Sequence, residues 1–197
     1  MVVKAVRLDL WRTCLPLSGR AGTLASVPAP TPPTPSLPSP PRGEHRLVLV
    51  EAAYDSPLVQ DLVAEVQAEY VVRYGGPDDT PLSPAEFAPP GGAFLVALVD
   101  GEPVGTAGLR DHGGGDVELK RMYVRAAHRR RGYARLLLAA VEERARSLGH
   151  RRLVLETGLL QPEAVALYRS AGYADTAPYG YYAESEHSVH LAKDLTA

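Results

Sequence analysis

The sequence predicts an α/β fold, in which a central, mixed and twisted sheet carries helices on both faces. Three observations support this. Segments with strand and helix periodicity follow one another in the order β-α-β-β-β-α-β-α-β-β between residues 45 and 195. Strand–helix–strand units on either side of a meander are typical of a mixed sheet covered by helices. The chain has 197 residues, of which 45% are hydrophobic, so one domain can bury a sizeable core.

The first half of the domain combines strands with one helix. Residues 45–52 form a short apolar strand, and residues 58–73 carry apolar side chains at steps of four, which predicts an amphipathic helix. Residues 75–92 then form a long loop, and loops of this length often serve a function. Residues 93–109 follow as a hairpin, because Asp100-Gly101 supplies the positive φ angles of a tight turn.

The second half alternates helices with strands. Residues 133–148 have helical spacing, which turns Glu142 and Arg146 toward water as an i,i+4 ion pair. Residues 152–156 are almost continuously apolar, as expected for a parallel strand that is covered on both faces. Another helix begins at Pro162, where a missing N–H does no harm. The last strands span residues 173–176 and 188–195.

A break in strand periodicity marks the centre of the domain. Within residues 116–124, the apolar residues Val117 and Leu119 occupy odd-numbered positions, whereas the apolar residues Met122 and Val124 occupy even-numbered positions. Because a regular strand has period 2, this switch predicts one extra residue, a β-bulge, near position 120 or 121. A bulge splays the strand from its neighbour and leaves backbone N–H and C=O groups free to pair with an extended ligand.

A basic turn follows the bulged strand. It contains His128, three consecutive arginines and Gly132, and a helix begins at Tyr133. The N-terminus of a helix carries unpaired N–H groups and a partial positive charge, which suit a phosphate, and Gly132 lets the backbone approach it closely. The sequence therefore predicts an anion site at this turn.

Two segments carry a resemblance to a known family. Residues 129–134, RRRGYA, resemble the pyrophosphate-binding signature of the GNAT superfamily of N-acetyltransferases, Arg/Gln-x-x-Gly-x-Gly/Ala. Residues 161–168, QPEAVALY, are similar to its second signature, Asn-x-x-Ala-x-x-Leu-Tyr, with Gln161 where Asn is usual. Both occur in the family's order and spacing, so the chain is identified as a member of the GNAT superfamily over residues 45–195.

The resemblance implies the GNAT fold and acetyl-CoA as cosubstrate. It also implies that the coenzyme is held by the bulged strand, the basic turn, the start of the next helix and the second signature. The residues assigned to coenzyme binding are Met122, Tyr123, Val124, Arg129, Arg130, Arg131, Gly132, Tyr133, Ala134, Arg135 and Gln161.

Acetyl transfer to an amine requires a neutral nucleophile and a proton for the departing thiolate. An alkylammonium has a pKa near ~10.4, so its neutral form costs roughly 4.6 kcal/mol at pH 7. Glu118 falls where histone-acetylating members of the superfamily carry their catalytic glutamate, and it is the expected base. Tyr168, on the Tyr of the second signature, is the expected acid, and the N–H of Met122 or Val124 polarises the thioester carbonyl. The alternatives are a Glu118 that balances neighbouring cations and a Tyr168 that only fills the core.

Composition limits the class of protein. The formal net charge of −2 disfavours a dedicated nucleic-acid binder, although basic residues concentrate between Lys120 and Arg152, where they suit a polyanionic coenzyme. The single cysteine, Cys14, allows no internal disulfide and suggests a reducing cytoplasm. No apolar run approaches the ~20 residues that a membrane span requires. Residues 1–43 are rich in proline and are expected to be a disordered extension of a domain at 44–197.

The sequence thus predicts a cytoplasmic, acetyl-CoA-dependent N-acetyltransferase that acts on the primary amine of a small molecule. The alternatives are acetylation of protein N-termini or lysines, and a non-catalytic acyl-CoA sensor. We expect neither nucleic acid nor a membrane as partner, and a homodimer is left open. Asp78 and Asp79 in the long loop favour a cationic acceptor.

Three histidines and three late tyrosines are further candidates for a metal site or for the acceptor pocket. No Cys or carboxylate set at ligand spacing accompanies the histidines, so we predict no metal site. One of three late tyrosines is a candidate for the acceptor pocket, and ordinary packing is the alternative. The residues are His112, His187, His190, Tyr179, Tyr181 and Tyr182.

Overall fold

The computed structural model of the protein describes residues 47–196; the proline-rich residues 1–43 and Cys14 lie outside this range. The strands in this range are β1 (Leu47–Glu51), β2 (Ala93–Val99), β3 (Glu102–Gly113), β4 (Asp116–Val124), β5 (Arg152–Gly158), β6 (Ala174–Asp175) and β7 (Ser188–Asp194). The α-helices are α1 (Pro57–Tyr74), α2 (Tyr133–Ser147) and α3 (Pro162–Ser170), and the 3₁₀ helices are η1 (Pro84–Phe87) and η2 (Ala126–His128).

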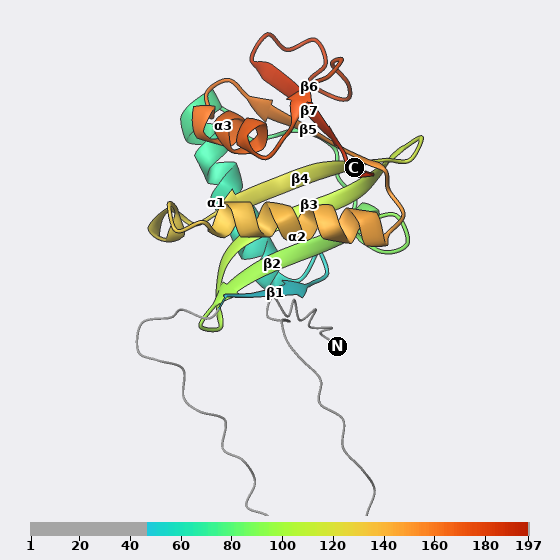
Figure 1. The fold of residues 1–197 in the computed structure, drawn as a ribbon. Helices are drawn as coiled ribbons and strands as arrows, with labels where there is room; N and C mark the ends of the chain where they lie inside the picture. The colour runs from blue at the N-terminus through green and yellow to red at the C-terminus, as the bar shows by residue number, and fades with distance from the viewer. Residues whose placement is uncertain (1–46, 197) are drawn as a thin grey trace, which may run out of the picture.

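The strands form one mixed sheet in the order β1-β2-β3-β4-β5-β7-β6 (Figure 1). β4 and β5 run parallel, and the other neighbouring strands are antiparallel. A parallel pair requires a crossover connection, which α2 provides. The predicted α/β fold and the order of its strands and α-helices are confirmed. The sequence missed η1 and η2, because a single 3₁₀ turn is too short to show a periodic pattern.

Helices cover both faces of the sheet. α2 and α3 lie on one face, where Leu137 and Tyr168 join a buried cluster with strand residues such as Leu155 (Figure 1). α1 lies on the other face, where Leu62 packs with Phe94 and further residues of a second cluster. The β4–β5 region therefore lies between two cores, which hold its backbone in place.

β4 contains the predicted bulge, at Arg121. Lys120 pairs with Gly108 and Tyr123 pairs with Thr106. Between these two pairs there are two residues on β4 but only one on β3. Arg121 accommodates the extra residue with a positive φ of 55°. On the other side of β4, pairing with β5 ends at Leu119 and Leu155. The two parallel strands therefore separate beyond this point, as the sequence predicted.

The prediction that Glu142 faces water is wrong. Its side chain is buried on α2, where Tyr173 Oη donates a 3.1 Å hydrogen bond to it and Lys193 Nζ lies 2.8 Å from Oε2. Arg146, its predicted partner, is 3.9 Å away, at the limit of an ion pair. Both close partners belong to the C-terminal part of the chain, so helical spacing alone could not reveal them.

Candidate active site

A cavity of about 340 Å³ lies where β4 and β5 separate. Its lining includes Met122, Gln161 and Tyr168, together with Lys120 and Glu156. Side chains from the loop after α1 and from the segment before β7 complete the lining. The long loop that the sequence marked as functional therefore contributes directly to the wall of the cavity.

α3, which carries the second signature, contributes to the cavity wall. Tyr168 is buried, and its Oη donates a 3.5 Å hydrogen bond to Sδ of Met122. Burial raises the pKa of Tyr168 far above the usual range of a phenol, so the hydroxyl keeps its proton. Gln161 is the N-cap residue of α3, and its Oε1 accepts hydrogen bonds of 3.4 Å from Tyr74 Oη and from Thr157 Oγ1.

The bulged strand turns backbone groups toward the gap. The N–H of Arg125 donates a 2.8 Å hydrogen bond to the carbonyl of Val104 in β3. Backbone groups of successive strand residues point to alternate sides, so those of Val124 and Met122 point away from β3, where pairing with β5 has ended. The Val124 carbonyl accepts a 2.7 Å hydrogen bond from Arg129 Nε. The N–H groups of Met122 and Val124 are thus directed at the opening between the strands.

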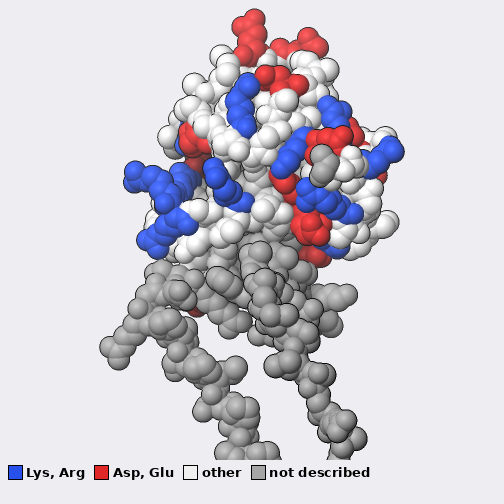
Figure 2. Space-filling model, viewed as in Figure 1, with Lys and Arg blue, Asp and Glu red and all other residues white. Residues whose placement is uncertain are grey.

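The turn between β4 and α2 has the geometry of an anion site. Gly132 is the N-cap of α2 with a φ of 84°, and Arg130 also has a positive φ, 59°. The side chains of Arg130, Arg131 and Arg135 are exposed. Figure 2 shows basic side chains gathered at the edge of the molecule where Figure 1 places this turn. A helix N-terminus and three guanidinium groups therefore share one surface.

The side chain of Arg129 is turned toward α1. Its guanidinium forms an ion pair with Glu69 of α1 and donates to the Val124 carbonyl, so it fastens the turn to α1. In this arrangement the guanidinium serves Glu69 and the Val124 carbonyl, and its assignment to coenzyme binding stays a prediction. Other predicted coenzyme residues pack their side chains in or against the two cores, which leaves their backbone for a ligand; they are Tyr123, Val124, Tyr133 and Ala134.

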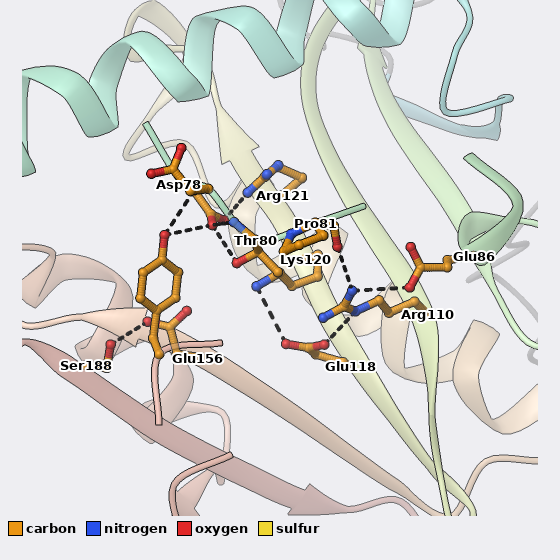
Figure 3. Close-up of polar contacts among 12 residues, drawn as sticks. Asp78, Thr80, Pro81, Glu86, Arg110, Glu118, Lys120, Arg121, Glu156 and Ser188 are labelled. Carbon is orange, nitrogen blue, oxygen red and sulfur yellow. Dashed lines mark hydrogen bonds and ion pairs between the residues drawn. The ribbon is translucent and has the colours of Figure 1, made fainter. Parts of the chain in front are cut away.

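Glu118, the base predicted from the sequence, is not among the residues that line the cavity. Its side chain is 4% exposed. Arg110 Nε donates a 2.6 Å hydrogen bond to Oε2, and Lys120 Nζ lies 3.6 Å from Oε1 (Figure 3). These contacts match the alternative in which Glu118 balances neighbouring cations, and they do not support its assignment as the base.

A different carboxylate, Glu156 near the end of β5, does line the cavity. Ser188 Oγ donates a 2.9 Å hydrogen bond to its Oε1 (Figure 3). Burial raises the pKa of Glu156 above the usual range of a carboxyl, and the charge of Lys120 offsets this only in part. Sequence reasoning missed Glu156. The available signal was an ionisable residue at the end of a strand that is otherwise apolar and covered on both faces.

Asp78, from the loop after α1, is held by several partners at the cavity wall. It forms an ion pair with buried Arg121, and Thr80 donates to its Oδ1 from the backbone N–H at 2.9 Å and from Oγ1 at 2.6 Å (Figure 3). Tyr182 Oη also donates to Oδ1, at 3.2 Å. Burial opposes ionisation of Asp78, but the charges of Lys120 and Arg121 outweigh it and hold the pKa at about 2. This carboxylate is therefore committed to its own neighbours and is not a free site for a cationic acceptor.

The comparisons with known proteins agree with this geometry. The sequence matches the acetyltransferase (GNAT) family over residues 59–173. The IAA acetyltransferase of Azospirillum brasilense is 38% identical over 156 residues, which cover 74% of this chain and 98% of that protein. The chain belongs to the GNAT family of acetyltransferases.

Solved structures agree with the GNAT assignment. The crystal structure of an acyl-CoA N-acyltransferase from Klebsiella pneumoniae has a TM-score of 0.63 and 28% identity, and the match covers 77% of this chain and 97% of that one. A GNAT acetyltransferase from Elizabethkingia anophelis, with acetyl-CoA bound, has a TM-score of 0.55 at 16% identity over 75% of this chain and 97% of its own. The predicted family and fold are confirmed, and the chain is an acetyl-CoA-dependent N-acetyltransferase.

The structure separates the late tyrosines that were candidates for the acceptor pocket. Of the three late tyrosines, Tyr182 lines the cavity, whereas Tyr179 contacts the rings of His112 and His190 with centroids 4.6 and 5.1 Å away. Within residues 47–196, no group of three or more His, Cys, Asp or Glu side chains could hold a metal ion. None of the helices in that range has the length and hydropathy needed to cross a membrane.

Replacing Asp78 with Asn tests the ion pair at the cavity wall. Its folded-state pKa of about 2 lies below the ordinary value of ~3.9, so the ionised group stabilises the fold at neutral pH and loses this effect as the pH falls toward 2. Asp78→Asn should lower the free energy of unfolding by about 2 kcal/mol or more at pH 7, with a smaller difference at pH 3.

Urea unfolding of both proteins at the two pH values measures this difference. The matched control is Asp79→Asn at the exposed neighbouring position, which should change the free energy of unfolding by less than about 0.5 kcal/mol. Equal losses in the two variants would contradict a specific role for Asp78.

Proposed function

We propose that this GNAT enzyme transfers the acetyl group of acetyl-CoA directly to the primary amine of a small molecule. The main support is that one cavity of about 340 Å³ holds both a carboxyl with a raised pKa, Glu156, and a protonated phenol, Tyr168. This volume is at the lower end for small-molecule sites. The cavity has to admit the thioester end of the coenzyme together with the acceptor, which favours a small amine over a protein segment.

The coenzyme is expected to span the anion site and the gap between the strands. Its pyrophosphate would bind at Gly132 and the first turn of α2, near the exposed Arg130, Arg131 and Arg135. The pantetheine arm would pair with the open backbone edge of β4 and reach the amide of Gln161. Its sulfur would then lie near the Tyr168 hydroxyl. The free N–H groups of β4 and the exposed arginines support this placement.

The cavity residues divide the chemistry between a base and an acid. Glu156 takes a proton from the acceptor's ammonium group, and the neutral amine attacks the thioester carbonyl carbon. The N–H of Met122 donates to the oxyanion that forms. When the C–S bond breaks, Tyr168 gives its proton to the thiolate, and the second proton of the attacking nitrogen passes to the resulting phenolate. The products are the neutral amide and the CoA thiol, and the Tyr168 hydroxyl is restored. Glu156 replaces Glu118 as the proposed base because only Glu156 lines the cavity.

The first test is release of the CoA thiol from acetyl-CoA by the purified chain. Release should depend on an added amine, and small amines should exceed peptides with a free N-terminus or lysine by on the order of tenfold in kcat/KM. The panel includes IAA, which the name of the Azospirillum brasilense relative contains. A preference for peptides would favour a protein acetyltransferase and contradict the proposal.

Replacing Glu156 with Gln should reduce kcat/KM by about 10²- to 10⁴-fold near pH 7. Glu156 works as a base only when it is ionised, and its pKa is raised by burial, so the wild-type rate should fall on the acid side at a pH above the usual carboxyl range. Glu156→Gln should lack this acid limb. Measuring kcat/KM from pH 5 to 9 tests both statements.

Glu118→Gln is the matched carboxamide variant on the neighbouring strand. It breaks a buried ion pair and should reduce the free energy of unfolding, yet it should keep the acid limb of the pH profile. If Glu118→Gln instead loses the limb and Glu156→Gln retains it, the base is Glu118.

Replacing Tyr168 with Phe should slow the chemical step by on the order of 10²-fold, because the leaving thiolate then lacks a proton donor. The affinity for acetyl-CoA, measured by calorimetry, should remain nearly unchanged. Tyr70→Phe, at another tyrosine of the cavity wall, is the control and should keep its rate. Unchanged turnover in Tyr168→Phe would return Tyr168 to a packing role.

A further inference from the structure

Lys120 is a buried cation in the cavity wall that has no close partner of its own. Its side chain is 6% exposed and lines the cavity. Among residues 47–196 its Nζ donates no hydrogen bond, and its ion-pair partner, Oε1 of Glu118, is 3.6 Å away. A buried ammonium group with unused donors is unfavourable unless an anion completes its coordination.

The neighbouring carboxylates are each neutralised by another cation. Glu118 accepts a 2.6 Å hydrogen bond from Arg110, which is much closer than its contact with Lys120. Asp78 forms its ion pair with Arg121. The charge of Lys120 helps to keep Asp78 ionised, but Lys120 forms no hydrogen bond or ion pair with it among residues 47–196, so the donors of the ammonium group remain available for a ligand.

Glu156 lies beside Lys120 and carries the opposite charge when it is ionised. Leu119 pairs with Leu155 in the parallel ladder, so the next residue on each strand, Lys120 and Glu156, points to the same face of the sheet. In the view of Figure 3 the Lys120 ammonium lies between Glu118 and Glu156. The strands separate at this point, and within residues 47–196 no ion pair joins Lys120 to Glu156. The cavity thus presents a cation and a proton acceptor side by side.

This pair is complementary to a molecule that carries an amine and a carboxylate on the same carbon atom. We propose that the acceptor is a free α-amino acid, whose carboxylate binds Nζ of Lys120 while its amine faces Glu156. The inference rests on the proposed function and names the acceptor class for the same cavity. A peptide N-terminus or a simple alkylamine lacks the α-carboxylate and would leave Lys120 unpaired.

The test compares acceptors that differ only in the carboxylate. Phenylalanine is paired with phenylalaninamide and phenethylamine, and leucine with leucinamide and isoamylamine. The wild-type enzyme should prefer each amino acid over both analogues by on the order of 10- to 100-fold in kcat/KM, because the analogues leave a buried charge unpaired. This comparison requires no variant, so it holds even if a substitution at Lys120 impairs folding.

Lys120→Met removes the charge and keeps most of the side-chain volume. It should lower the ratio of kcat/KM for each amino acid to kcat/KM for its amide or alkylamine by on the order of 10- to 100-fold, mainly through KM for the amino acid. The ratio cancels the shared effect of the lost charge on the pKa of Glu156. Lys193→Met is the matched control, since Lys193 pairs with Glu142 and does not line the cavity. Lys193→Met should change kcat/KM for neither class of acceptor.

Two results would overturn the inference and leave the proposed function intact: equal wild-type rates for amino acids and their analogues, or an equal loss for both classes in Lys120→Met. A third result would overturn both the proposed function and the acceptor class. If acetyl-CoA binds in calorimetry but no amine, amino acid or peptide releases the CoA thiol, the proposed function fails and the acceptor class fails with it.

Discussion

The extra residue at Arg121 determines most of the site. In a regular strand, residues 119, 121 and 123 would share one face, but here Leu119 packs with the α2 side of the sheet and Tyr123 with the α1 side. The same irregularity accompanies the end of β4–β5 pairing, which opens the cavity. Arg121 also holds Asp78, so the bulge fixes the loop that forms the cavity wall. One residue therefore sets the packing, the opening and the position of the loop.

The ionisable groups around the cavity are organised by their partners. Buried ion pairs contribute little net stability, but breaking one is costly, so they fix side chains in a defined arrangement. Asp78 is kept ionised by Arg121 and Lys120, whereas Glu156 is half-buried without a direct ion pair and its pKa is raised. Two carboxyl groups of one cavity thus have opposite tendencies to hold a proton. Such a difference separates a structural carboxylate from one that holds a proton more readily.

The fold could be predicted from the sequence because its signals are local. Helical spacing, turn residues and the change of parity between Leu119 and Met122 all lie within short windows, and the bulge occurred where that change placed it. The site was less accessible because its contacts join distant segments. Glu118 is held by Arg110, which faces it across the β3–β4 ladder, and that register is not visible in either strand alone. Similarly, Arg129 is held by Glu69, sixty residues earlier in the chain.

Glu156 illustrates the same limit from the other side. Family resemblance directed attention to β4, and both strands offered a glutamate at the cavity end of the sheet. Only the three-dimensional arrangement shows that Glu156 lines the cavity and that Glu118 is enclosed by cations. The late tyrosines show the same limit, because Tyr182 lines the cavity whereas Tyr179 contacts two histidine rings.

α1 links the two ends of the site mechanically. Glu65 and Glu69, one helical turn apart, form ion pairs with Arg125 and Arg129 beside the turn that precedes α2. Tyr70 of the same helix lines the cavity. An 18-residue helix transmits displacement along its axis with little bending. One rigid element therefore joins the two parts of the candidate site, and a displacement of the turn before α2 would be passed along α1 to Tyr70 in the cavity wall.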